Sequence, residues 1–409
     1  MYLRANNLLP DLQSGFGAHH STEKAILKVM SDILLALDSG NLAVLTLLDL
    51  SAAYDSVDHT TILHWLQKSY GVCGTVLSWF TSYLTGRLQY VRTMASSSVP
   101  SAVFYSVPQD SVLGPILFVL YTADLLTLIQ SHGRTPHTYA VDTQIMGICQ
   151  PSEKDVMQLQ LSACLDDVSA WMVANRLQLN QNKTEVLWCS SACRQYQIPT
   201  NSVQVGSTSV QPVSTVKNLG VHVDADVRMH THITAVVRAR FATQRQLRGV
   251  QQCLLRSAVV SMIRALVLSK MDYCNSVLAG APESLLRHLQ SIMNSAAKLI
   301  FQVGKYQHVT PLLHELHWLK VPERITGKFR LCVLTYRCLN GTAPQYLTEM
   351  TNPVSNRDSL YRYCLRSSDS TTLIIPTTRR STLGDRSFPA AAATAWNSLP
   401  ARLRNATPL

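Results

Sequence analysis

Apolar and polar residues in the first half of the chain recur with two periods, one typical of helices and one typical of strands. Between Ser21 and Asp38 apolar residues return about every third or fourth position, which predicts an amphipathic helix with Ser21 or Thr22 as its cap. Gly40-Asn41 then interrupts the pattern. Leu42–Leu50 is a nearly continuous apolar run, as in a strand that is buried on both faces.

The same alternation continues to about residue 226. Helical periodicity predicts helices over 51–69, 75–84, 112–129 and 152–175. Strand-like runs lie at 88–94, 101–107, 138–148, 184–190, 203–205 and 221–223, and the run at 138–148 has a possible turn in its middle.

Beyond residue 226 the pattern becomes mainly helical. Segments 232–270 and 282–301 each combine an apolar face with arginines, and the last hundred residues mix short helices with loops that contain proline and arginine. A mixed domain of strands and helices over 1–226, followed by a helical module over 227–301 and a mixed region over 302–409, fits this order.

Composition narrows the class of protein. The 409 residues are 46% apolar and 15% charged, which is typical of a globular chain. The longest apolar runs are about half of the ~20 residues that a membrane-spanning helix needs, and the N-terminus does not resemble a secretory signal. The ten cysteines include no zinc-binding pattern, so we expect free thiols in an intracellular, reducing compartment.

Charge is spread unevenly. Residues 1–226 hold 12 Lys and Arg against 17 Asp and Glu, a net charge of −5, and residues 227–409 hold 24 against 8, a net charge of +16. A basic half joined to a mildly acidic half indicates an anionic polymer such as nucleic acid as the partner, or else a solvated basic face without a partner.

Two aspartates stand out for their position. Asp49 ends the buried run at 42–50, so its carboxylate has to be paired, protonated or bound to a cation, unless Asp49 or Ser51 caps the next helix. Asp142 lies in the strand-like segment 138–148. Two carboxylates that meet across a sheet are the minimum for a pair of magnesium ions in phosphoryl transfer, although a separation of about 90 residues is weak support.

Nine short motifs, taken together in this order, resemble the reverse transcriptase of a LINE-type (non-LTR) retrotransposon of the chicken-repeat or jockey-like group. They span almost the whole chain and are QSGF (13–16), LDLSAAYDSVDH (48–59), VPQDSVLGP (107–115), YAVD (139–142), LQLNQNKTE (177–185), NLGV (218–221), MDYCNS (271–276), LHWLKV (316–321) and WNSLP (396–400).

The resemblance implies an α+β fold. Residues 1–226 would form a polymerase palm, an antiparallel sheet with helices, with incomplete fingers, as in an N-terminally truncated copy. Residues 227–301 would form a helical thumb. The implied activity is RNA-directed DNA synthesis with Mg²⁺. The implied partners are an RNA template and a DNA primer, or an RNA–DNA hybrid, bound by the basic residues 227–409. No membrane is expected as a partner.

The resemblance also assigns roles to single residues. The metal-binding pair would be Asp49 and Asp142, and Lys183 would lie near the triphosphate as a proton donor. The remaining positions are those that touch nucleotide, template or primer: Tyr54 as the steric gate, Gln109 and Ser111 in the loop that supports template and nucleotide, and Asn218, Leu219 and Gly220 as the primer grip.

Four positions depart from the family pattern. Val141 replaces the first aspartate of the family's YADD, and valine offers no metal ligand. Ser106 and Asp110 replace both glycines of GVPQGS, and Gly17 replaces the arginine of QSGFR. These changes predict a reverse-transcriptase-like protein with weak or absent catalysis. The alternatives are a nucleic-acid-binding protein that keeps only the scaffold, and a relic that folds poorly.

Overall fold

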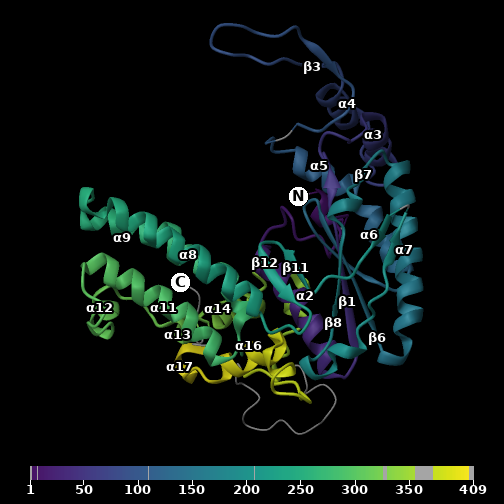
Figure 1. Cartoon of the computed structure of the whole chain (residues 1–409). Helices are drawn as coiled ribbons and strands as arrows, with labels where there is room; N and C mark the ends of the chain where they lie inside the picture. Colours follow the sequence, from purple (N-terminus) through teal and green to yellow (C-terminus); the bar gives the residue numbers. More distant parts are fainter. Residues whose placement is uncertain are drawn as a thin grey trace. The chain divides into compact units, whose positions relative to one another are not determined.

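The computed structural model describes residues 2–6, 8–108, 110–206, 208–325, 329–354 and 372–404 (Figure 1). The chain forms two compact units. The first unit comprises residues 1–20, 43–188 and 198–213, and the second comprises 21–42, 189–197 and 214–409. Each unit is described by itself.

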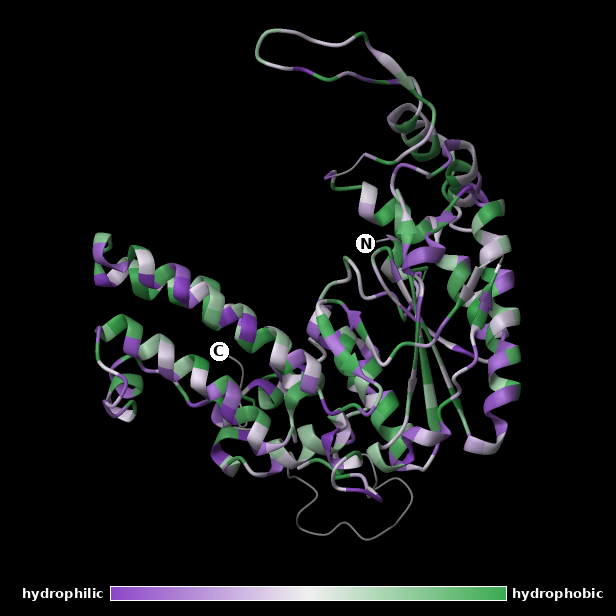
Figure 2. Ribbon diagram, viewed as in Figure 1, coloured by the Kyte–Doolittle hydropathy of each residue, from purple (hydrophilic) through white to green (hydrophobic). Residues whose placement is uncertain are grey.

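A four-stranded sheet is the centre of the first unit. Its strand order is β5 (Thr135–Tyr139), β6 (Asp142–Cys149), β1 (Leu42–Leu48) and β8 (Glu185–Cys189). Strand β1 is buried at all but one position, as its continuous apolar run predicts. Helix α7 (Lys154–Ala174) contacts β6 and α6 (Ala123–Ser131), and its alternating hydrophobic and hydrophilic residues are visible in Figure 2.

Smaller elements surround this sheet. Three antiparallel pairs join β2 (Leu50–Ser51) to β7 (Gln178–Leu179), β3 (Arg87–Gln89) to β4 (Ser101–Val103), and β9 (Val203–Val205) to β10 (Thr208–Val210). The other helices are α1 (Tyr2–Ala5), α3 (His59–Lys68), α4 (Gly74–Leu84) and α5 (Gly114–Tyr121), with short helical turns η1 (Pro151–Glu153) and η2 (Gln181–Lys183).

One helical stretch of the described residues, Gly114–Ser131, is long and apolar enough to cross a membrane by length and composition alone. More than half of it, 56%, is buried inside the protein. It comprises α5 and α6, and α6 packs on β5 and α7. Its hydrophobicity is therefore accounted for by burial in the core.

The second unit is mainly helical. Its helices are α2 (Thr22–Asp38), α8 (His230–Val250), α9 (Arg256–Ile263), α10 (Ser269–Met271), α11 (Glu283–Phe301), α12 (Thr310–Glu315), α13 (Val321–Ile325), α14 (Phe329–Leu339), α15 (Gln345–Thr348), α16 (Phe388–Asn397) and α17 (Ala401–Arg404). It also holds the hairpin β11 (Thr215–Asn218)–β12 (Val221–Asp224), the π-helical turn η5 (Arg264–Leu268) and the short 3₁₀ turns η3 (Ala192–Gln197), η4 (Gln251–Cys253), η6 (Asn275–Leu278) and η8 (Gly384–Arg386). Helices α8 and α11 pack side by side (Figure 1).

The predicted helices at 21–38, 75–84, 152–175 and 282–301 are confirmed as α2, α4, α7 and α11. The prediction of a helix from residue 51 is wrong, because Ser51 lies in β2 and α3 begins only at His59. Neither Asp49 nor Ser51 is its cap. Asp58 has that role, since its Oδ1 accepts a hydrogen bond from the backbone N–H of Thr61 at 2.8 Å.

Other predicted elements are shorter or interrupted. The helix expected at 112–129 is divided at Thr122, and the one at 232–270 is interrupted between residues 251 and 255. The strands expected at 88–94 and 101–107 shrink to β3 and β4. The possible turn within 138–148 is confirmed, because β5 and β6 are joined there. The division of the chain at residues 226 and 301 stays a prediction.

Candidate active site

Asp49 lies at the break between β1 and β2. Its backbone carbonyl accepts a hydrogen bond from the N–H of Asn180 at 2.9 Å, directly beside the pairing of Leu50 with Leu179. After Asn180 the turn η2 brings Lys183 back toward Asp49. The Nζ atom of Lys183 lies 3.1 Å from Oδ2 of Asp49, whose side chain is 32% exposed. The pairing of β2 with β7 therefore holds an ammonium group against this carboxylate.

Asp142 is the first residue of β6 and pairs with Tyr139 at the end of β5. The two residues between them, Ala140 and Val141, form the turn of the hairpin, and Ala140 has a φ of +56°. Val141 is thus a turn residue, in the turn that the sequence allows within 138–148. A tight two-residue turn favours residues with positive φ, which Ala140 supplies here.

The two carboxylates influence each other. Partial burial and, after it, the Asp49 carboxylate raise the pKa of Asp142 above its usual range. Asp142 is exposed to water. Of the two causes of its raised pKa, the repulsion between the Asp49 and Asp142 carboxylates is therefore the one that matters for the site. The structure therefore brings Asp49, Asp142 and Lys183 to one end of the sheet, and their roles in catalysis stay a prediction.

Gln13 braces the hairpin turn, a role that the sequence does not reveal. Its Oε1 accepts a hydrogen bond from the N–H of Ala140 at 2.9 Å, and its Nε2 donates to the carbonyl of the same residue at 3.2 Å. Gly15 lies so close that a Cβ atom on it would be 2.2 Å from the Ala140 nitrogen. The only sequence signal for this contact was the QSGF motif itself.

The loop before α5 is attached to the segment after β2. The N–H of Val107 donates to the carbonyl of Tyr54 at 3.0 Å, and Nε2 of His59 lies 2.8 Å from the carbonyl oxygen of Ser106. The Tyr54 ring packs against Phe118 with centroids 5.0 Å apart. These contacts hold Tyr54 beside the loop that the motif resemblance assigns to template and nucleotide.

Ser111 closes that loop. Its hydroxyl donates to the carbonyl of Pro108 at 2.7 Å and accepts from the N–H of Gly114 at 2.9 Å. This arrangement ties the loop to the start of α5. Gln109, which was expected to support template and nucleotide, lies outside the described residues.

The two residues that replace the family's glycines have strained backbone angles. Ser106 has a φ of +92° and Asp110 a φ of +55°. Residues with a side chain rarely adopt such angles, and a strained residue of this kind costs about 1–3 kcal/mol. At Gly17 a Cβ atom would lie 2.6 Å from Nδ1 of His20, so an arginine there would require the His20 ring to move.

Asn218, Leu219 and Gly220 belong to the second unit and are described separately from the carboxylates. They form the end of the β11–β12 hairpin, where Asn218 pairs with Val221. Leu219 and Gly220 make a two-residue turn with φ values of +44° and +84°. The NLGV motif therefore forms the end of a hairpin, and its role as primer grip stays a prediction.

The side chains around Asp49 do not form a metal site with several protein ligands. Among the described residues no group of three or more His, Cys, Asp and Glu side chains is placed to hold a metal ion. Oδ2 of Asp49 makes no hydrogen bond to a described residue and has the Lys183 ammonium as its neighbour. Val141 contributes no ligand atom between the two aspartates.

Comparison with known proteins identifies the sequence pattern. Residues 1–223 match the family model described as "Reverse transcriptase (RNA-dependent DNA polymerase)". The chain is 26% identical over 339 residues to a probable RNA-directed DNA polymerase from transposon BS of Drosophila melanogaster, covering 78% of this chain and 35% of that protein. It is 24% identical over 306 residues to the RNA-directed DNA polymerase from mobile element jockey of Drosophila funebris, covering 72% and 32%. The chain thus spans about a third of the length of these relatives.

Similar solved structures include two telomerases. Telomerase from Candida albicans, in complex with a fragment of telomeric RNA, matches with a TM-score of 0.39 and 10% identity, over 78% of this chain and 57% of that one. Apo telomerase from Candida tropicalis matches with a TM-score of 0.41 and 10% identity, over 82% and 51%.

Proposed function

The chain belongs to the reverse transcriptase (RNA-dependent DNA polymerase) family, and we propose that it keeps the nucleic-acid-binding scaffold of a polymerase while its catalysis is lost or weak. It is similar to jockey-type non-LTR retrotransposon polymerases and has an α+β polymerase fold. The sheet β5-β6-β1-β8 and its helices would belong to the palm and fingers, residues 227–301 would be the thumb, and residues 302–409 a basic C-terminal region.

Within this proposal each motif residue has a role. Asp49 and Asp142 are the remaining acidic pair, and Lys183 faces the triphosphate. Tyr54 is the steric gate, and its packing on Phe118 supports this by fixing the ring in place. Ser111 holds the template loop through Pro108 and Gly114, and Gln109 in the same loop supports template and nucleotide. Asn218, Leu219 and Gly220 grip the primer.

The observation that carries the proposal is the composition of the β5–β6 turn. Family members use divalent metal ions, and the turn position that matches the family's first hairpin aspartate holds Val141. Asp142, one residue later, already pairs with Tyr139 in the ladder, so it reaches the position of Val141 only if the turn shifts. Loss of a ligand to the reacting metal ions raises the barrier by about 4 kcal/mol, roughly a thousandfold in rate.

Two further features support impaired catalysis. The ammonium of Lys183 occupies one oxygen of Asp49, so a cation that binds there has to displace it. Asp110, exposed and strained, adds a negative charge to the loop assigned to template and nucleotide. The residues present therefore do not fit a two-metal centre with Mg²⁺, and no catalytic step is assigned to one.

Nucleic-acid binding is the function that these changes leave in place. The partners we propose are an RNA template with its DNA primer, or an RNA–DNA hybrid, because residues 227–409 carry a net charge of +16. Lysine and arginine contacts to phosphates release counterions, so binding has to weaken linearly with the logarithm of salt concentration. Absence of binding at low salt would remove this function from the proposal.

Primer extension tests the catalytic part. Purified protein is incubated with poly(A)/oligo(dT), thymidine triphosphate and Mg²⁺, with Asp49→Asn as the matched control. The proposal expects no extension above that control. Extension by the unmodified chain alone would show a working polymerase and overturn the proposal.

A further inference from the structure

The turn at the end of the β11–β12 hairpin is strained. Leu219 has a φ of +44° and Gly220 a φ of +84°, in a loop of only two residues between Asn218 and Val221. Glycine adopts such angles freely, but leucine does so only when its surroundings hold it there. Something in the second unit has to support Leu219.

Tyr273 provides that support. Its hydroxyl donates a hydrogen bond to the carbonyl oxygen of Leu219 at 2.8 Å. Its ring lies against Gly220, where a Cβ atom would be 3.3 Å from Cε1 of the tyrosine. One side chain therefore bonds to the first residue of the turn and packs against the second.

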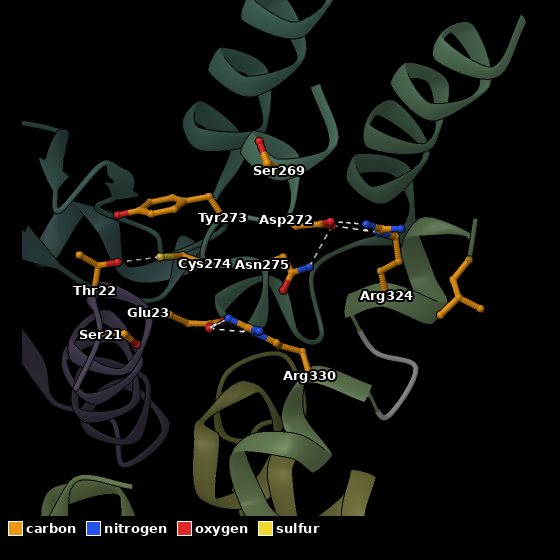
Figure 3. Close-up of a pocket in the computed structure, with 11 residues that line it drawn as sticks. Ser21, Thr22, Glu23, Ser269, Asp272, Tyr273, Cys274, Asn275, Arg324 and Arg330 are labelled. Atoms are coloured by element: carbon orange, nitrogen blue, oxygen red, sulfur yellow. Dashed lines mark hydrogen bonds and ion pairs between the residues drawn. The ribbon is translucent and has the colours of Figure 1, made fainter. Parts of the chain in front are cut away.

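Tyr273 is in turn held by its own segment. Cys274, the next residue, has a φ of +52°, which turns the chain between α10 and η6. On the other side, Oδ1 of Asp272 accepts a hydrogen bond from Nε of Arg324 at 2.9 Å. Figure 3 shows Asp272 and Arg324 pointing toward each other and joined by this ion pair, and both line the cavity drawn there.

A second ion pair anchors the far side of the segment. Oε1 of the buried Glu23 accepts from the hydroxyl of Ser276 at 2.7 Å. Oε2 of Glu23 accepts from Nε of Arg330 at 2.9 Å, and Figure 3 shows this pair. The cavity between the two ion pairs has a volume of about 510 Å³. Because both arginines are engaged by carboxylates, we interpret this cluster as a support for the 271–276 segment rather than as an anion site.

We propose that Tyr273 is a positioning residue that fixes the β11–β12 turn, and that the MDYCNS motif serves the primer grip through it. This inference rests on the proposed function, which assigns Asn218, Leu219 and Gly220 to the primer terminus. It gives a role to a motif far along the chain from the hairpin.

The test compares the affinity of the full chain for two RNA–DNA hybrids of equal length, one with a recessed primer 3′ end and one with blunt ends. Tyr273→Phe keeps the ring against Gly220 and removes the hydroxyl that donates to the carbonyl oxygen of Leu219. Tyr306→Phe, at a tyrosine that is 94% exposed, is the matched control.

We expect Tyr273→Phe to reduce the preference for the recessed end by roughly 2- to 10-fold, the range for loss of one hydrogen bond. Its affinity for the blunt hybrid and its thermal unfolding should match those of Tyr306→Phe, which a general structural defect would not allow. If the unmodified chain prefers the recessed end and Tyr273→Phe keeps that preference, this inference is wrong. If the unmodified chain has no such preference, the primer-grip assignment falls, and this inference with it.

Discussion

The ammonium nitrogen of Lys183 lies 3.1 Å from Oδ2 of Asp49, so the carboxylate that follows strand β1 faces a cation supplied by the chain itself. The two residues are 134 positions apart in sequence, and the antiparallel pairing of Leu50 with Leu179 brings them together. We propose that this ion pair and Val141 have the same consequence, because both would reduce the capacity of the site to hold the divalent metal ion that family members use.

Removal of the Lys183 charge should strengthen metal binding at Asp49. The Lys183 side chain is 68% exposed, and an exposed ion pair contributes at most about 1 kcal/mol, so we expect Lys183→Gln to raise Mn²⁺ affinity up to about fivefold. Titration calorimetry measures this change. Lys68→Gln, at an exposed lysine in the last turn of α3, is the control. Equal affinities of Lys183→Gln and the unmodified chain would contradict competition between lysine and metal.

Restoring the first lost glycine should stabilise the protein. Ser106 has a φ of +92°, and relief of such strain gains about 1 kcal/mol in the free energy of unfolding. Denaturant unfolding of Ser106→Gly measures the gain. In Ser101→Gly, within strand β4, glycine should instead lower stability because it only adds freedom to the unfolded chain. A loss of stability in Ser106→Gly would show that the serine is not strained.

Buried His232 should make the second unit sensitive to acid. Burial and then His222 lower the pKa of His232 from 6.5 to about 4, against a smaller opposing effect of Asp224. Its Nδ1 accepts the His222 N–H at 3.4 Å, which requires the neutral ring. The unfolded chain therefore binds more protons between pH 4 and 6.5. The stability from the neutral ring, on the order of 3 kcal/mol, is complete above pH 6.5 and is lost as pH falls toward 4.

His232→Gln tests this dependence because glutamine does not titrate. Urea unfolding at several pH values should show a smaller decrease in stability between pH 6.5 and 4 in this variant. His230→Gln, at the exposed first residue of α8, should keep the full decrease. The account of His232 fails if His232→Gln and His230→Gln depend on pH in the same way.

Helix α8 should carry part of the affinity for nucleic acid. Arg238 and Arg245 are both exposed and lie seven residues apart, on one face of the helix. If each contacts one phosphate, their joint replacement by alanine lowers the slope of log affinity against log salt by about 2. Salt titrations of RNA–DNA hybrid binding measure this slope.

Arg256→Ala is the matched control for that experiment. The Arg256 guanidinium pairs with Glu315 at 2.9 Å and lies 4.1 Å from the centroid of the Phe301 ring. Its charge is therefore already engaged within the protein, and its replacement should leave the salt slope nearly unchanged. A larger effect of Arg256→Ala than of the double α8 variant would remove α8 from the proposed interface.

The sequence predicts much of the first unit because its signals are local. The continuous apolar run at 42–48 gives β1, and the periodic pattern of 154–174 gives α7. The helix expected from Ser51 fails for a local reason too. Residues 52–56 form turns, in which Ala52 has a φ of +48°, and the capping aspartate at position 58 comes only afterwards.

Contacts between distant residues could not be predicted in this way. The clamp of Gln13 on Ala140 and the hydrogen bond of Tyr273 to Leu219 each join segments more than 50 residues apart. Hydrophobic periodicity reports which residues are buried but not which partner covers them. The motifs identified the segments, and only the three-dimensional arrangement assigns these two side chains to the turns that they support.

Primer extension by the purified chain on poly(A)/oligo(dT) tests the central claim most directly, because it depends on the acidic pair and on the position held by Val141. We predict that the unmodified chain extends no more primer than Asp49→Asn, and that Val141→Asp restores little, since Ser106 and Asp110 remain strained. Extension by the unmodified chain above the Asp49→Asn control would contradict the claim that this member of the family has lost its catalysis.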